Sequence, residues 1–134
     1  MQSAIPTTHT SKTGRWAGYA ISVLVILFLI FDGLIKVLRL APAVEGTVQL
    51  GYPEQLVLSI GIIELACLAI YVFPRTSVLG AILLTGYLGG AIATHVRNGS
   101  DLFSVVFPIL IGGLLWGGLF LRDHRLRALL PFRR

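Results

Sequence analysis

The sequence predicts an all-α membrane protein, folded as a four-transmembrane antiparallel helix bundle. Three observations support this fold class: the composition, four long apolar runs, and the short segments rich in Gly, Pro and polar residues between them. Of the 134 residues, 55% are hydrophobic and only 13% are charged, and the mean hydropathy is +0.84. Because a soluble domain carries about 25% charged residues, the composition favours a chain embedded in a lipid bilayer.

The charges and the single cysteine exclude several classes of function. The net charge is +5, but the basic residues stand mainly at the ends of apolar runs, where they orient helices in a membrane. We therefore expect no nucleic-acid partner. Cys67 is the only cysteine in the sequence, so no internal disulfide or cysteine-based metal cluster can form. We expect neither a metal ion nor a bound cofactor.

The first apolar run, residues 16–38, follows a polar segment over 1–13 that we expect to be disordered. Lys12 and Arg15 precede the run, which gives this part of the chain some likeness to a signal peptide. However, the run is longer than the apolar core of a signal peptide, and no small-residue cleavage motif follows it. It is long enough to span a bilayer, which needs roughly 20 residues, and we interpret it as an uncleaved transmembrane helix.

The second predicted transmembrane helix covers residues 54–73, between Pro53 and Pro74. Pro is favourable in the first turn of a helix and unfavourable in its interior, so the two prolines set these limits. The connection over 39–52 holds Pro42 and two glycines, which predicts a loop with room for one short helix over 43–50.

The third and fourth predicted helices cover residues 77–96 and 102–121, which completes a transmembrane domain over 14–121. Ser100 or Asp101 can cap the fourth helix. The last segment, 122–134, is a basic tail that we expect on the membrane surface. The spacings Gly86/Gly90 and Gly113/Gly117 are typical of close helix packing, within the bundle or between two copies of the chain.

The distribution of Lys and Arg predicts the orientation in the membrane. Four spans place both termini on one side, and the side richer in Lys and Arg faces the cytoplasm. The termini and the 73–77 turn hold Lys12, Arg15, Arg75, Arg122, Arg125, Arg127, Arg133 and Arg134. The opposite side holds Lys36, Arg39 and Arg97. Both termini are therefore predicted to be cytoplasmic.

Glu64 is the main candidate for a functional residue, because it lies near the middle of an apolar helix. A carboxylate there costs about 2.5–3.5 kcal/mol on insertion scales, so it must be protonated, paired with Lys36 or His95, or exposed to water. The functional interpretation is a catalytic proton donor or acceptor. The structural alternative is a neutral glutamic acid that holds helices together by a hydrogen bond.

Asp32 and Lys36 stand one helical turn apart, in the favourable order for an ion pair. Asp32 is a candidate second catalytic carboxylate and Lys36 a candidate ligand-binding group. The alternative is that Lys36 extends to the membrane surface and only neutralises Asp32.

The third helix adds polar residues at its non-cytoplasmic end. His95 is a candidate catalytic base or proton relay, or else a residue that caps the helix carbonyls. Tyr87, Thr94 and Arg97 are candidate ligand-binding residues. Together with Glu64, they predict an intramembrane polar pocket that opens to the non-cytoplasmic side.

Several segments together resemble the DoxX-like family of small bacterial membrane proteins. These segments are Gly33–Lys36, Leu50–Pro53, Gly61–Leu65, Phe73–Arg75 and Gly86–His95. The resemblance covers about residues 25–121 and implies a four-helix protein of the bacterial inner membrane. Relatives in the family include subunits of a thiosulfate:quinone oxidoreductase, and Glu64 and His95 match positions of the family pattern.

Two functions compete at this point. The first is binding of a small lipophilic or quinone-like molecule, with acid–base chemistry of an isomerase or hydrolase. The second is a non-catalytic membrane subunit or anchor of a quinone-linked redox complex, with a homo-oligomer or a redox partner. A transporter or proton channel is the weakest hypothesis, because the cytoplasmic half lacks a polar path.

Overall fold

The computed structural model describes residues 12–123 and residue 126, and these residues form five α-helices. The described residues contain no β-strand. The helices are α1 (Lys12–Val37), α2 (Ala41–Gln49), α3 (Leu56–Val72), α4 (Ser77–Asn98) and α5 (Leu102–Arg122), with a 3₁₀ turn η1 (Pro74–Thr76) between α3 and α4.

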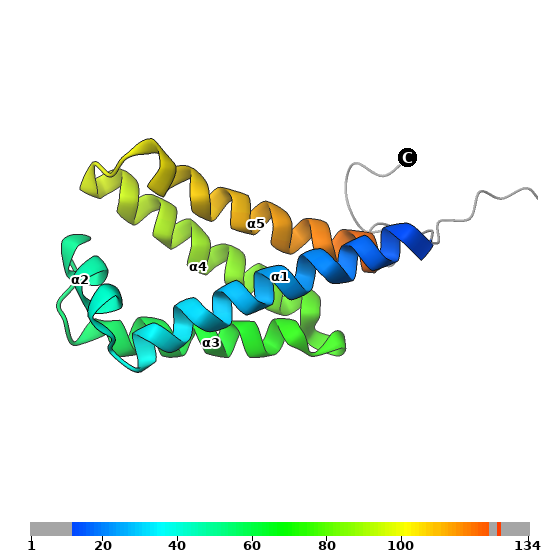
Figure 1. The fold of residues 1–134 in the computed structure, drawn as a ribbon, viewed down its shortest axis with the longest axis horizontal. Helices are drawn as coiled ribbons and strands as arrows, with labels where there is room; N and C mark the ends of the chain where they lie inside the picture. The colour runs from blue at the N-terminus through cyan, green and yellow to red at the C-terminus, as the bar shows by residue number, and fades with distance from the viewer. Residues whose placement is uncertain (1–11, 124–125, 127–134) are drawn as a thin grey trace, which may run out of the picture.

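The four long helices pack as an antiparallel bundle, and α2 covers one end of it (Figure 1). Helices α1 and α4 each pack against both α3 and α5. Helix α1 begins at the same end of the bundle where α5 finishes (Figure 1). We call this end the termini end, and the opposite end the α2 end.

The helix boundaries differ from the predicted ones by a few residues. Helix α1 begins at Lys12, four residues before the predicted start. Residues 1–11 of the segment predicted to be disordered, and most of the basic tail, lie outside the described residues. Helix α3 begins at Leu56, because residues 53–55 form a turn. Helix α4 continues to Asn98 and ends at Gly99, whose φ of 73° is in the left-handed region.

Three helical segments of the described chain are long and apolar enough to cross a membrane: Lys12–Val37, Pro74–Asn98 and Leu102–Arg122. The fourth long helix, α3, is shorter at 17 residues but equally apolar in character. Large hydrophobic side chains face outward from these helices, among them Leu24, Ile62, Ile82 and Leu110. An exterior of this kind is suited to lipid and unsuited to water.

Glycines allow close helix contacts, but at other positions than the predicted pairs. A Cβ atom on Gly118 would lie 2.5 Å from the Ser22 hydroxyl and 3.1 Å from the Gly18 carbonyl, so α1 and α5 cross there at close range. The prediction of close packing at Gly86/Gly90 and Gly113/Gly117 is wrong within the bundle, because a Cβ at any of these four would meet nothing within 4 Å.

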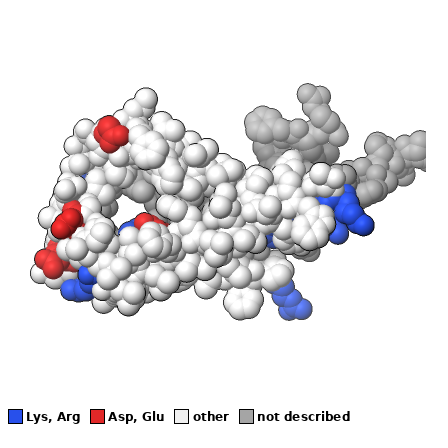
Figure 2. Space-filling model, in the orientation of Figure 1, with Lys and Arg blue, Asp and Glu red and all other residues white. Residues whose placement is uncertain are grey.

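The two halves of the bundle are packed differently. Toward the termini end, apolar side chains such as Leu68, Leu84, Leu115 and Leu119 are almost fully buried. Toward the α2 end, α4 and α5 diverge from α1 and α3 (Figure 1), and the space-filling view shows a deep hollow there (Figure 2). Among the ionisable residues of the apolar runs, Asp32, Lys36 and Glu64 lie in this hollow half.

Candidate functional site

A cavity of about 420 Å³ lies among the helices at the α2 end, and we call it the inner cavity. All five helices contribute to its wall. The lining residues are Phe28, Leu29, Asp32, Lys36, Thr47, Leu50, Tyr52, Ile60, Ile63, Glu64, Gly86, Tyr87, Leu88, Gly90, Ala91, Thr94, His95, Phe107, Pro108 and Ile111. Most of the wall is apolar, with a few polar groups, which is the usual character of a small-molecule site.

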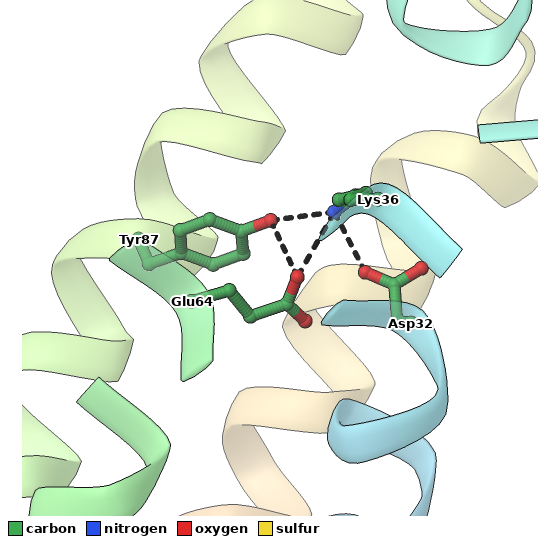
Figure 3. Close-up of polar contacts among 4 residues, drawn as sticks. All are labelled: Asp32, Lys36, Glu64 and Tyr87. Carbon is green, nitrogen blue, oxygen red and sulfur yellow. Dashed lines mark hydrogen bonds and ion pairs between the residues drawn. The ribbon is translucent and has the colours of Figure 1, made fainter. Parts of the chain in front are cut away.

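Four of the predicted site residues form one hydrogen-bonded group, the Lys36 cluster, made of Asp32, Lys36, Glu64 and Tyr87 (Figure 3). The Lys36 Nζ donates to Asp32 Oδ2 at 2.7 Å, to Glu64 Oε1 at 3.1 Å and to the Tyr87 hydroxyl at 2.6 Å. The Tyr87 hydroxyl in turn donates to Glu64 Oε1 at 3.0 Å. Three helices, α1, α3 and α4, are thus joined through a single ammonium group.

The local sequence explains how Lys36 reaches Glu64. Asp32 and Lys36 are four residues apart on α1 and therefore share a face. On α3, Gly61 precedes Glu64 by three residues, and a Cβ on Gly61 would lie 2.8 Å from Lys36 Cβ. The absence of a side chain at Gly61 lets α1 approach α3 closely enough for the Lys36 ammonium to meet the Glu64 carboxyl.

The two carboxyl groups of the cluster differ in their surroundings. The Glu64 side chain is fully buried, whereas 31% of the Asp32 side chain is exposed. Glu64 Oε2 is the only buried side-chain oxygen or nitrogen in the described part of the chain that has no hydrogen-bond partner. An unpaired acceptor of this kind costs about 1–3 kcal/mol, so it is a feature that requires an explanation.

Lys36 uses all of its hydrogen-bonding capacity within the cluster. An ammonium group has three protons, and three acceptors lie within 3.1 Å of it. Of the alternatives that the sequence left open, pairing of Glu64 with Lys36 is the one observed. The ammonium points into the bundle and does not extend to the membrane surface.

Thr94 and His95 line the inner cavity from α4. The Thr94 hydroxyl donates to the Gly90 carbonyl at 2.8 Å and is hydrogen-bonded to the Tyr52 hydroxyl at 3.0 Å. The His95 Nδ1 lies 3.1 Å from the Ser100 hydroxyl. His95 thus shares the cavity with Asp32 and Glu64, although its hydrogen bond is to the α4–α5 connection.

Arg97 lies outside the cavity, unlike the other predicted site residues. Its guanidinium donates to the Leu50 carbonyl at 3.1 Å and lies close to Gly51. Gly51 has a φ of 96°, which L side chains rarely adopt, so the chain turns sharply at this contact. Arg97 therefore attaches the end of α2 to α4, and its role in ligand binding stays a prediction.

A second cavity, of about 410 Å³, lies farther toward the α2 end, and we call it the outer vestibule. Its lining residues are Asp32, Ile35, Lys36, Pro42, Ala43, Gly46, Thr47, Gln49, Leu50, His95, Asn98, Ser100, Asp101 and Ser104. Amide and hydroxyl side chains make up five of its fourteen lining residues, against four of twenty in the inner cavity. Asp101 is the N-cap residue of α5, and Ser104 donates to its Oδ1 at 2.8 Å.

Sequence reasoning missed a polar group in the other half of the bundle. Tyr71 is fully buried, and its hydroxyl donates to the Leu115 carbonyl at 2.9 Å. Ser22 lies 3.5 Å from the same hydroxyl and accepts a hydrogen bond from Arg122 Nε at 2.9 Å. The signal available in the sequence was Ser22 itself, which shares a helix face with Gly18, Val25 and Leu29.

Comparisons with known proteins give one match. A sequence model described as the DoxX-like family matches residues 20–118, which include α3, α4 and most of α1 and α5. The matched range contains every residue of the Lys36 cluster. No curated protein and no solved structure matches the chain.

Proposed function

The chain belongs to the DoxX-like family, and from this premise we propose that it binds a small lipophilic molecule inside the membrane and acts on it by acid–base chemistry. The observation that carries the proposal is the joint position of two carboxyl groups and one ammonium group on the wall of a largely apolar cavity. Apolar walls favour a lipophilic or quinone-like ligand, and the Lys36 cluster supplies the polar contacts.

In the proposed topology, the protein spans the bacterial inner membrane four times. At ~1.5 Å per residue, the 17 residues of α3 are about 26 Å long, which is near the lower limit for a span. The excess of Lys and Arg at the termini end favours a cytoplasmic position for both termini. The inner cavity and the outer vestibule would then open to the non-cytoplasmic side.

The charges of the Lys36 cluster support a role in proton transfer. One ammonium neutralises only one of the two carboxyl groups, and an uncompensated charge in an apolar interior costs several kcal/mol. The group can therefore hold one exchangeable proton. We assign this proton to Glu64 Oε2, because Oε1 already accepts two hydrogen bonds.

Hydrolysis of an epoxide illustrates the proposed division of roles. Glu64 gives its proton to the epoxide oxygen as a C–O bond breaks, and a water molecule attacks the carbon. Asp32, which is reached by solvent, accepts the proton that the water loses. Return of this proton from Asp32 to Glu64 restores both groups, and Lys36 lies between them.

Ligand binding is tested by photo-cross-linking of the protein in lipid nanodiscs. The probe is a lipophilic decyl chain that carries a diazirine. We expect cross-links on cavity residues such as Leu88 and Ile111. Ala91→Trp, which fills the cavity, should abolish these cross-links, whereas Ile82→Trp, on the outward face of α4, should not. Labelling that is insensitive to Ala91→Trp would exclude a ligand in the cavity.

Acid–base chemistry is tested with 1,2-epoxydecane as substrate, and the diol is measured by gas chromatography. Loss of one general acid lowers the rate by about 10²–10⁴-fold, so Glu64→Gln should remove detectable turnover while probe labelling remains. Equal turnover by wild type and Glu64→Gln would remove Glu64 from the mechanism.

A further inference from the structure

The inner cavity and the outer vestibule meet, because five residues line both of them. These residues are Asp32, Lys36, Thr47, Leu50 and His95. With volumes of about 420 and 410 Å³, the two spaces together can hold a molecule longer than either of them alone.

The lining becomes more polar from the inner cavity to the outer vestibule. The deep end is formed by side chains such as Leu29, Leu88 and Ile111. The outer end presents the side chains of Gln49, Asn98 and other amide and hydroxyl residues. A ligand that fits both ends must itself have an apolar part and a polar part.

The charges around the joined space disfavour an anion. Lys36 is the only Lys or Arg among the described residues that line it, and its three protons are already bound by Asp32, Glu64 and Tyr87. Asp101 adds a third carboxyl group at the outer end. An anionic head group would therefore meet three carboxyl groups, and the Lys36 ammonium would have no proton left to donate to it. This arrangement disfavours the binding of an anion.

We propose that the joined space holds one amphiphile, with its apolar part in the inner cavity and an uncharged, hydroxyl-bearing head in the outer vestibule. This inference rests on the proposed function, since it specifies the ligand of the same cavity. Hydroxyl groups both donate and accept, so they can pair with the amide of Asn98 and with the hydroxyl of Ser100, which both line the outer vestibule. The hollow between the helices at this end gives such a molecule access from the bilayer (Figure 2).

The test compares three diazirine probes with the same ten-carbon chain: an alcohol, a carboxylate and a hydrocarbon without a head group. Labelling is measured by mass spectrometry in nanodiscs at about pH 8, where a carboxylate is ionised. We expect the alcohol to label the cavity about tenfold more than the carboxylate, which corresponds to about 1.4 kcal/mol. The alcohol should also label the cavity more strongly than the hydrocarbon.

A pair of charge variants makes the test sharper. Gln49→Lys places a free ammonium group in the outer vestibule and should raise labelling by the carboxylate probe several-fold. Gln55→Lys adds the same charge at an exposed position that lines neither cavity, and it should leave labelling unchanged.

The outcomes separate this inference from the proposed function. Equal labelling by alcohol and carboxylate, or no response to Gln49→Lys, would overturn the head-group assignment while a ligand site remained. Equal labelling by alcohol and hydrocarbon would overturn it as well. If Ala91→Trp blocks the labelling by none of the three probes, both proposals are overturned.

Discussion

At the scale of single residues, the structure depends most on Lys36. Its ammonium is hydrogen-bonded to the carboxyl groups of both Asp32 and Glu64 and to the Tyr87 hydroxyl. Only 16% of its side chain is exposed, so water cannot replace these contacts fully. The cluster is therefore a polar junction between α1, α3 and α4, in addition to its proposed role in chemistry.

Lys36→Met should destabilise the protein by about 3–5 kcal/mol, because it leaves the carboxyl groups of the Lys36 cluster without their cation. Thermal unfolding in detergent, followed by circular dichroism, measures the effect. Adding Asp32→Asn to Lys36→Met should recover part of the loss, since the charge that has lost its cation is then removed. Arg75→Met, at an exposed position of η1, should change stability by less than about 0.5 kcal/mol. Similar losses for Lys36→Met and Arg75→Met would contradict the importance of the cluster.

A pH effect is expected at Asp101, which lies outside the membrane-spanning segments at the start of α5. The hydrogen bond from Ser104 holds the pKa of the Asp101 carboxyl below its usual value. Because the pKa is lowered in the folded state, the charged carboxylate stabilises that state at pH values above the usual pKa of the group. This contribution is lost as the pH falls through the lowered pKa. Ser104→Ala should return the pKa toward its usual value in a carboxyl-carbon NMR titration. An unchanged titration would show that Ser104 has no part in it.

At the scale of helices, the bundle is held by a few close crossings. Gly118 lies against Ser22 and the Gly18 carbonyl, so α5 touches the backbone of α1. Gly117, the adjacent residue, has free space around it. Gly117 and Gly118 therefore form a matched pair for substitution by alanine, because one position is open and the other is crowded by α1.

Gly118→Ala should destabilise the protein by about 1–3 kcal/mol, because its Cβ would overlap with α1. Gly117→Ala should be neutral or stabilising by up to about 1 kcal/mol, since alanine favours the helical conformation. Thermal unfolding of the two variants under the same conditions checks the difference. If both variants unfold at the same temperature, the α1–α5 crossing does not have the described geometry.

At the scale of the whole molecule, the two ends of the bundle differ in character. The termini end is filled with apolar side chains, whereas the α2 end is hollow and carries most of the acidic groups visible in Figure 2. This asymmetry suits a protein that receives a ligand from one side of the membrane, provided that the α2 end faces away from the cytoplasm.

The orientation is testable with single cysteines, because Cys67 is the only native one and Cys67→Ser removes it. In that background, Glu45→Cys lies on the exposed surface of α2 and Arg75→Cys in η1. A membrane-impermeant thiol reagent should label Glu45→Cys in intact cells, and Arg75→Cys only after the membrane is permeabilised. The reverse pattern would place the α2 end in the cytoplasm.

The long helices, their approximate limits and the need of Glu64 for a partner could be predicted from the amino-acid sequence. These properties follow from local composition and from the cost of an isolated carboxylate in an apolar environment, and both are independent of how helices pack. The Asp32–Lys36 ion pair was equally predictable, because its two members lie on one helix.

Which groups meet across helices follows from the packing of the helices in three dimensions. This packing paired Glu64 with Lys36 and Tyr87, turned Arg97 toward Leu50, and placed the close crossing at Gly118 and not at Gly86 or Gly113. Helical periodicity states which residues share a face, but the neighbour of that face depends on the rotation and crossing of four helices at once. For the same reason, the joined cavities could not be read from the sequence, since they result from the divergence of α4 and α5 from α1 and α3.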